Sequence, residues 1–188
     1  MLDVLSFLLS LGSALATAVD KINASKEKRL ARRILQIHFL FQTIIDDAKR
    51  IFGLIQDAEA GLQEYGERRY TRIIQENLQS QNKRLGELSL QLRDPDAASV
   101  VKLQEPHIRD KIVRSAQSKS RSIWFAIERL SYSALSFEDG QLVVSHNRGK
   151  VPAFPEFERQ LEMVEQLESY SKSISASILN KISLSDLL

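Results

Sequence analysis

The feature that most limits the fold of this chain is a run of apolar residues between positions 30 and 65, spaced alternately four and three positions apart. This spacing places the side chains along one face of an α-helix. We therefore predict one long helix over about residues 25–66, about 60 Å long at about 1.5 Å per residue. The run consists of Leu30, Ile34, Ile37, Phe41, Ile44, Ala48, Ile51, Ile55, Ala58, Leu62 and Tyr65.

Further apolar residues beside this face make it wider than the seam of a two-stranded coiled coil. A wide apolar face is typical of a helix in the core of a bundle. The sequence therefore predicts that the long helix packs against several others. The widening residues are Leu35, Leu40, Ile45, Phe52 and Leu54.

The rest of the chain has the pattern of helices separated by clear breaks. We predict helices over about residues 67–93, over about ten residues after Pro95, over 107–136, and from about Pro155 onward. Between the last two, the turn signals EDGQ and NRGK flank a β-prone QLVV. The predicted fold is all-α: an elongated antiparallel bundle of about four long helices, with an apolar N-terminal helix and one short loop or hairpin near 136–155.

The composition agrees with a helical protein and excludes several kinds of chemistry. The 188 residues include only 7 Gly and 4 Pro, as expected for long helices. The chain has no cysteine, so disulfides, thiolate metal sites and cysteine nucleophiles are excluded. The net charge is only +2, and the basic clusters beyond residue 80 lie among acidic residues. We therefore expect no nucleic-acid partner.

The N-terminal segment MLDVLSFLLSLGSALATAVDKI contains no charged residue from Val4 to Val19. As a helix, this stretch is about 24 Å long, against about 30 Å for the hydrocarbon core of a bilayer. Small and hydroxyl-bearing residues recur along one face, which is typical of membrane helices that associate with one another. We predict that this face consists of Ser6, Ser10, Gly12, Ser13 and Thr17, and that the lipid-facing residues are Leu5, Leu8, Leu9 and Leu15.

Basic residues follow the apolar segment directly and form what we call the basic collar. Its members are Lys26, Lys28, Arg29, Arg32 and Arg33. Basic residues beside a membrane helix stay on the cytoplasmic side and attract anionic lipid. We therefore expect a cytoplasmic, membrane-associated protein whose bundle lies on the cytoplasmic side of the membrane.

Two other interpretations of the N-terminal segment remain open. The small residues Ala-Thr-Ala before Val19 resemble a signal-peptide cleavage site, although no positive charge precedes the apolar stretch. Alternatively, the segment is a soluble helix that packs on the bundle through its apolar face. Packing and membrane contact are compatible, because a helix sheltered in the resting state can be released to insert.

Signals for catalysis are scarce. His38, His107 and His146 lie on different predicted elements, and the chain has no Glu-x-x-His pair, P-loop or dinucleotide-binding motif. We expect no metal and no cofactor. Arg33 and His38 have Arg-x4-His spacing and so resemble the HEPN-type ribonucleases, which are also small helical bundles. That resemblance implies a histidine general base beside an arginine that steadies a phosphate.

The leading hypothesis is a non-enzymatic helical bundle that engages a membrane through its N-terminal helix, residues 1–24, and permeabilises it as an oligomer. Residues 25–188 form the bundle. This layout is similar to that of the HeLo-type cell-death effectors, a likeness of architecture without a shared motif. The alternatives are a soluble interaction module or homo-oligomer that binds a helical protein partner, and the Arg33/His38 ribonuclease.

Overall fold

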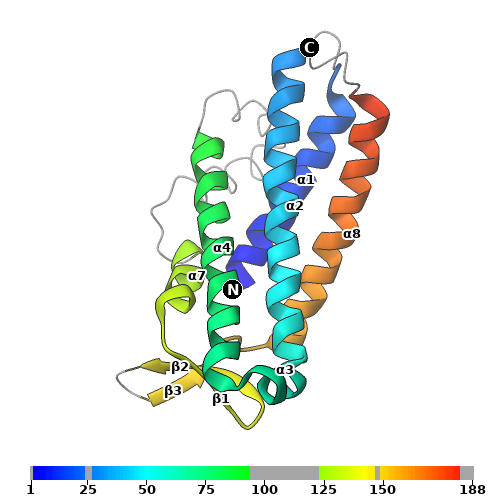
Figure 1. Cartoon of the computed structure of the whole chain (residues 1–188). Helices are drawn as coiled ribbons and strands as arrows, with labels where there is room; N and C mark the ends of the chain where they lie inside the picture. The colour runs from blue at the N-terminus through cyan, green and yellow to red at the C-terminus, as the bar shows by residue number, and fades with distance from the viewer. Residues whose placement is uncertain (1, 24–26, 94–122, 147–148, 183–188) are drawn as a thin grey trace.

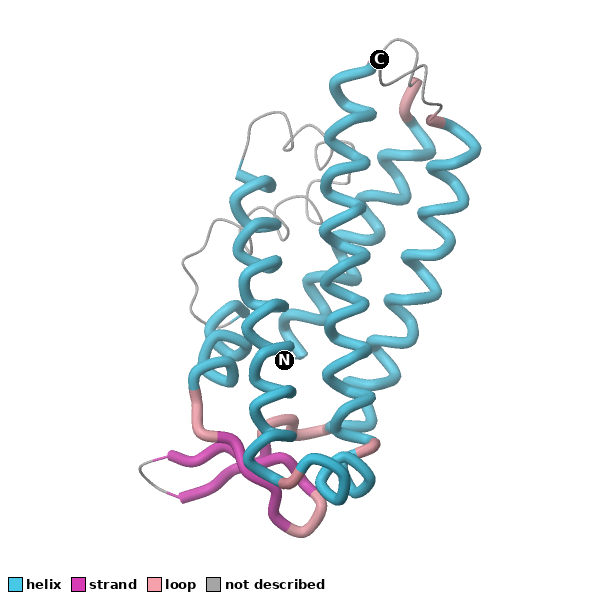
Figure 2. The backbone as a smooth tube through the Cα atoms, in the orientation of Figure 1, coloured by secondary structure: helices cyan, strands magenta, loops and turns pink. Residues whose placement is uncertain are grey.

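The computed structural model describes residues 2–23, 27–93, 123–146 and 149–182. Within these ranges, long helices and one small sheet form an elongated molecule (Figure 1, Figure 2), so the predicted all-α fold with a short β segment is confirmed. The helix predicted after Pro95 and residues 107–122 lie outside the described residues. The elements are α1 (Leu2–Lys21), α2 (Lys28–Gln56), α3 (Ala58–Tyr65), α4 (Glu67–Arg93), α7 (Ile123–Tyr132), β1 (Leu135–Glu138), β2 (Gln141–His146), β3 (Gly149–Pro152) and α8 (Phe157–Lys181).

Helix α2 is the central helix of the bundle, with α4 on one side and α8 on the other (Figure 1). Helix α1 packs chiefly against α8 and also against α2. Helix α2 runs antiparallel to α1, α4 and α8. In contrast, α1 and α8 run parallel, because Lys181 near the end of α8 contacts Asp20 near the end of α1. The antiparallel arrangement therefore holds between α2 and its three neighbours, and not for the pair α1 and α8 (Figure 1).

The predicted apolar face of α2 forms the centre of the hydrophobic core. Every member of the run from Ile34 to Ile51 is at most 2% exposed. The widening residues Leu40, Ile45 and Phe52 are buried as well. The width of this face explains why α2 contacts helices on two sides.

The prediction of one unbroken helix is wrong at Asp57, where α2 ends and the short helix α3 begins in a new direction (Figure 1). Backbone hydrogen bonds continue across the bend, from Asp57 N to the Gly53 oxygen (2.9 Å) and from Gly61 N to the Asp57 oxygen (3.0 Å). The apolar spacing also continues, through Ala58 and Leu62. Because neither signal is interrupted, periodicity alone could not reveal the change of direction.

The bend places Gly61 of α3 directly against Tyr70 of α4. A Cβ at Gly61 would lie 2.1 Å from Cζ of Tyr70, so a larger residue does not fit there without movement. The Tyr70 hydroxyl donates a hydrogen bond to the carbonyl oxygen of Leu54 (2.6 Å). This bond ties the start of α4 to the end of α2.

A buried ion pair sets the register between α2 and α4. Arg84 Nη1 lies 2.7 Å from Oδ2 of Asp47 and donates to the carbonyl oxygen of Thr43 at 3.2 Å. Burial raises the pKa of the Asp47 carboxyl group, and the positive charge of Arg84 opposes that rise. Asp47 is only 5% exposed, so without Arg84 its charge would lose its main compensation and keep only the weaker effect of Arg50.

The predicted hairpin is present and is extended by a third strand, so that the sheet has the antiparallel order β1-β2-β3. Asp139 and Gly140 form the turn between β1 and β2, and both have positive φ (48° and 76°), as two-residue hairpin loops require. The sheet lies at the end of the bundle beside α3 (Figure 2). There the Phe137 ring packs on Tyr70, with ring centroids 6.1 Å apart.

We expect Gly61→Ala to lower the free energy of unfolding by about 1–3 kcal/mol, the usual cost of extra volume in a packed site. The Tyr70 ring cannot move aside freely, because its hydroxyl is bonded to Leu54. Urea unfolding measures the change. The matched control is Gly53→Ala, where a Cβ meets no atom within 4 Å; it should be neutral or stabilising by up to about 1 kcal/mol. Equal stability of the two variants would contradict the described packing.

Candidate functional site

The N-terminal helix α1 lies inside the molecule, against α8 and α2 (Figure 1). Three of the four residues predicted to face lipid, Leu5, Leu8 and Leu15, are 0% exposed. Leu9 is partly buried against the same core. In this docked conformation the four side chains therefore face protein. Their assignment to lipid applies only to a conformation in which α1 has left the bundle.

Helix α1 is also, among the described helices, the one that is long and apolar enough to cross a membrane. The apolar stretch is Val4–Lys21, 18 residues long, of which 56% are buried in the bundle. Core helices of soluble proteins and signal sequences near an N-terminus have the same properties. Length and composition therefore agree with a membrane-associated helix and equally with a core helix.

Gly12 allows α1 to approach closely the two helices that hold it. A Cβ at this position would lie 2.8 Å from Cδ1 of Tyr170 on α8 and 3.0 Å from Cζ of Phe41 on α2. Any larger residue must displace one of these rings. We call this contact of Gly12 with Phe41 and Tyr170 the glycine slot. From the sequence, Gly12 is predicted to belong to the hydroxyl face. In the structure, its nearest neighbours are two aromatic rings.

The hydroxyl-bearing residues of α1 form a half-buried face on which the hydroxyl groups of Ser10 and Thr17 bond within the helix. Ser10 donates to the carbonyl oxygen of Ser6, and Thr17 donates to that of Ser13, each at 3.0 Å. Such bonds satisfy a hydroxyl group without a partner on another helix. This face can therefore lie against water, protein or lipid with little change in its own hydrogen bonding.

An ion pair joins the C-terminal ends of α1 and α8. Lys181 Nζ donates to the carbonyl oxygen of Asp20 at 2.7 Å and lies 3.4 Å from its carboxylate Oδ1. The two side chains are 39% and 69% exposed. Exposed pairs of this kind contribute little to stability, so apolar contacts supply most of the docking energy of α1.

The basic collar lies on the first turns of α2, directly after the connection from α1. Lys28, Arg29 and Arg32 are exposed. Arg33 is half-buried, and its Nη1 donates to Oε1 of Gln36 at 3.0 Å. Lys26 lies outside the described residues. The described members are therefore next to the end of α1 and largely accessible.

Arg33 and His38, the candidate ribonuclease pair, point to different neighbours. His38 is 6% exposed, and its Nε2 lies 2.9 Å from Oγ of Ser175 on α8. Burial lowers the pKa of the His38 ring. Arg33 instead bonds Gln36 on its own helix. Five positions along a helix separate two side chains by about 140°, so in this structure Arg33 and His38 lie on different sides of α2.

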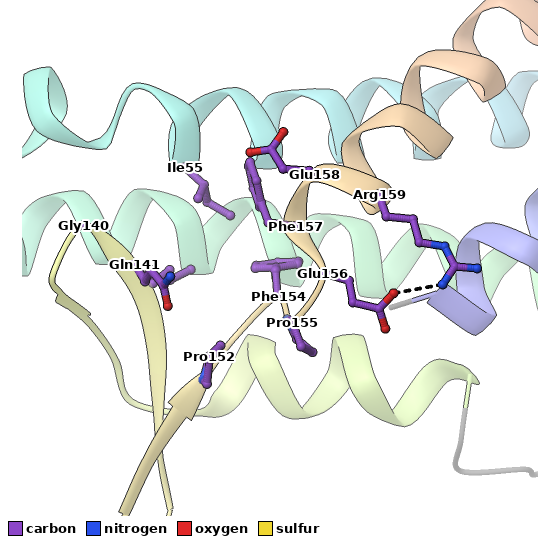
Figure 3. Close-up of a pocket in the computed structure, with 11 residues that line it drawn as sticks. Ile55, Gly140, Gln141, Pro152, Phe154, Pro155, Glu156, Phe157, Glu158 and Arg159 are labelled. Carbon is purple, nitrogen blue, oxygen red and sulfur yellow. Dashed lines mark hydrogen bonds and ion pairs between the residues drawn. The ribbon is translucent and has the colours of Figure 1, made fainter.

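A cavity of about 690 Å³, which the sequence analysis did not predict, lies where α2, the sheet and the start of α8 meet (Figure 3). Phe154 and Phe157 line it together with Ile55. At its edge, Arg159 Nη1 pairs with Oε2 of Glu156 at 2.9 Å. A mostly apolar hollow of this size can hold a small apolar group. The available sequence signal was VPAFPEF, where prolines and phenylalanines gather before the last helix.

Within the described residues, no three His, Cys, Asp or Glu side chains are grouped so that they could hold a metal ion. No protein-family model, curated protein or solved structure matches this chain. The function must therefore be inferred from the residues and contacts of the chain itself, and α1 with its surroundings is the most informative part.

We expect Gly12→Ala to weaken the docking of α1, because the added methyl group must displace Tyr170 or Phe41. The expected loss is about 1–3 kcal/mol in the free energy of unfolding, measured by chemical denaturation. Gly86→Ala on α4 is the matched control, since a Cβ there meets no atom within 4 Å. If the Gly12 variant were as stable as this control, the glycine slot would not hold α1.

Proposed function

We propose that this protein is a membrane-associated helical bundle that keeps its apolar N-terminal helix docked and inserts it into a membrane when the helix leaves the bundle. One observation carries the proposal. Helix α1 combines an apolar stretch of nearly bilayer length with two hydroxyl groups, those of Ser10 and Thr17, that donate to carbonyl oxygens of the same helix. It is therefore equipped for hydrocarbon as well as for the protein core.

The apolar side chains of α1 need cover in either environment. Burying a side chain such as Leu5 or Leu8 completely contributes about 1.5–3 kcal/mol relative to leaving it in water. Hydrocarbon is as apolar as a protein core, so transfer from bundle to bilayer keeps this contribution. Release of α1 into water is therefore strongly disfavoured. Transfer of α1 from its contacts with α8 and α2 to contacts with lipid is not. This difference favours a helix that departs at a membrane.

Departure of α1 uncovers apolar surface on α2 and α8, around Phe41 and Tyr170. Large exposed apolar patches promote association, so we infer that further copies of the chain cover this surface. In such a homo-oligomer, the hydroxyl faces of several α1 helices meet, as small and hydroxyl residues do between membrane helices. Polar groups lining a shared path would then permeabilise the bilayer.

The basic collar supplies the electrostatic part of the proposal. Each basic residue near an anionic membrane adds about 1 kcal/mol of attraction. Lys28, Arg29 and Arg32 follow α1 so closely that insertion of the helix brings them to the lipid headgroups. By the positive-inside tendency, the bundle then lies on the cytoplasmic side.

A second candidate is a soluble interaction module in which α1 never leaves the bundle. The complete burial of Leu5, Leu8 and Leu15 in one core with α2 and α8 favours this candidate. Its binding surface for a helical partner would be an outer face of the bundle. The two candidates differ in one measurable respect, because only the first requires α1 to move.

A reversible cross-link across the glycine slot tests that movement, in a chain without other cysteines. The double substitution Gly12→Cys with Tyr170→Cys places one thiol on α1 and one on α8 at positions that face each other, since a Cβ at Gly12 would lie 2.8 Å from Cδ1 of Tyr170. Flotation with vesicles of equal parts phosphatidylglycerol and phosphatidylcholine is then measured. We expect the oxidised protein to stay at the bottom of the gradient and the reduced protein to float. Dye release from the same vesicles measures permeabilisation.

The parent chain, treated with the same oxidant and reductant, is the control and should float equally under both conditions. Equal flotation of the oxidised and reduced double variant would contradict insertion of α1. Absence of flotation for both the parent and the reduced variant would instead favour the soluble module.

A further inference from the structure

His38 is a titratable side chain buried in the seam between α2 and α8. Its Nε2 lies 2.9 Å from the Ser175 hydroxyl oxygen. That hydroxyl already donates its hydrogen to the carbonyl oxygen of Ser171, also at 2.9 Å. While the hydroxyl donates to this carbonyl oxygen it can only accept from the ring, and the hydrogen of the neutral imidazole is then on Nε2.

The other ring nitrogen of His38, Nδ1, is buried and has no hydrogen-bond partner among the described residues. In a neutral ring, Nδ1 is an uncharged acceptor without a hydrogen, and leaving it without a partner costs little. A proton on Nδ1 would create a buried cation with an unsatisfied N–H group, which is costly in a poorly solvated site. The docked conformation therefore favours the neutral ring.

Four ion pairs lie on the helices around this seam, and burial is the cause that lowers the pKa of His38. None of these four pairs includes the imidazole ring. The pairs are Lys172–Glu168 within α8, Lys49–Glu168 between α2 and α8, Lys181–Asp20 between α8 and α1, and Arg84–Asp47 between α4 and α2.

The seam that contains His38 also holds α1. Phe41 lies one helical turn after His38, and the centroids of the two rings are 6.5 Å apart. Tyr170 directly precedes Ser171 on α8. Phe41 and Tyr170 are the two walls of the glycine slot. Movement of His38 toward water would therefore separate α2 from α8 at the place where both contact Gly12.

We propose that His38 is a proton-sensitive contact: protonation of Nδ1 separates α2 from α8, opens the glycine slot and releases α1. The use of the released helix at a membrane rests on the proposed function, whereas the release itself does not. The docked conformation binds this proton less readily than the released one. Docking is thus fully stable above the ordinary histidine pKa of 6.5 and weakens below it. One proton changes the ratio of released to docked protein by at most about tenfold per pH unit.

Thiol labelling of the variant Ala14→Cys measures the release without a membrane. Ala14 lies on α1 and is 0% exposed, and the introduced thiol is the sole cysteine of the chain. The rate of reaction with dithiodipyridine, divided at each pH by the rate for urea-unfolded protein, reports the released fraction. We expect this ratio to rise about five- to tenfold from about pH 7.5 to about pH 5.5.

Substitution of the histidines assigns the effect to one side chain. His38→Gln keeps an N–H donor for Ser175 without titrating, so its labelling ratio should change less than about twofold over the same range. His38→Leu provides the same test if the glutamine variant does not fold. The matched control is His107→Gln with His146→Gln, which removes the other two histidines and should keep the full rise. A flat parent profile, or a rise that persists without His38, would overturn the proposal.

Flotation with the phosphatidylglycerol vesicles at the same two pH values separates this inference from the proposed function. If labelling depends on pH and on His38 but the protein does not float, the result supports proton-dependent release and contradicts membrane insertion. If the protein floats but its labelling is independent of pH, the result supports membrane insertion and contradicts the role of His38.

Discussion

Every functional property proposed for this bundle depends on how the apolar surface of α1 is covered. In the docked conformation the cover comes from α8 and α2, and Gly12 permits an approach so close that a Cβ would lie 2.8 Å from the Tyr170 ring. Water cannot replace this cover, because each large apolar side chain left exposed costs about 1.5–3 kcal/mol. A bilayer or another protein surface can replace this cover. Protein and bilayer are thus two kinds of environment that can cover α1, and the proposed function depends on its transfer between them.

The proposed transfer draws on a difference between the two sides of α2, which carry different polar contacts. Toward α4, the buried carboxylate of Asp47 pairs with Arg84 at 2.7 Å, and loss of such a pair would leave a buried charge without its partner. Toward α8, the polar contacts are the neutral bond between His38 and Ser175, of a type that contributes about 1 kcal/mol, and the partly exposed ion pair of Lys49 with Glu168, of a type that contributes little. The α2–α4 side is therefore the firmer one, and the side that holds α1 is easier to open.

Local patterns in the sequence predict the elements of this fold well, because each depends on residues close together in the chain. The spacing from Ile34 to Ile51 predicts the buried face of α2, and EDGQ predicts the turn at Asp139 and Gly140. The bend at Asp57 was missed because the apolar spacing and the backbone hydrogen bonds both continue through it. The parallel pairing of α1 with α8, the burial of the leucines of α1 and the cavity beside Phe154 arise from contacts between residues distant in sequence, which a single sequence without aligned relatives does not reveal.

The central claim is that α1 can open while the remainder of the bundle stays folded. Native-state hydrogen exchange followed by mass spectrometry tests it most directly, because exchange reports the free energy of local opening for each segment. We predict that amides of α1 exchange through an opening of lower free energy than amides in the middle of α2 and α4, which stay protected during that opening. Exchange of α1, α2 and α4 at one common free energy, through global unfolding alone, would contradict the claim and make α1 a permanent core helix.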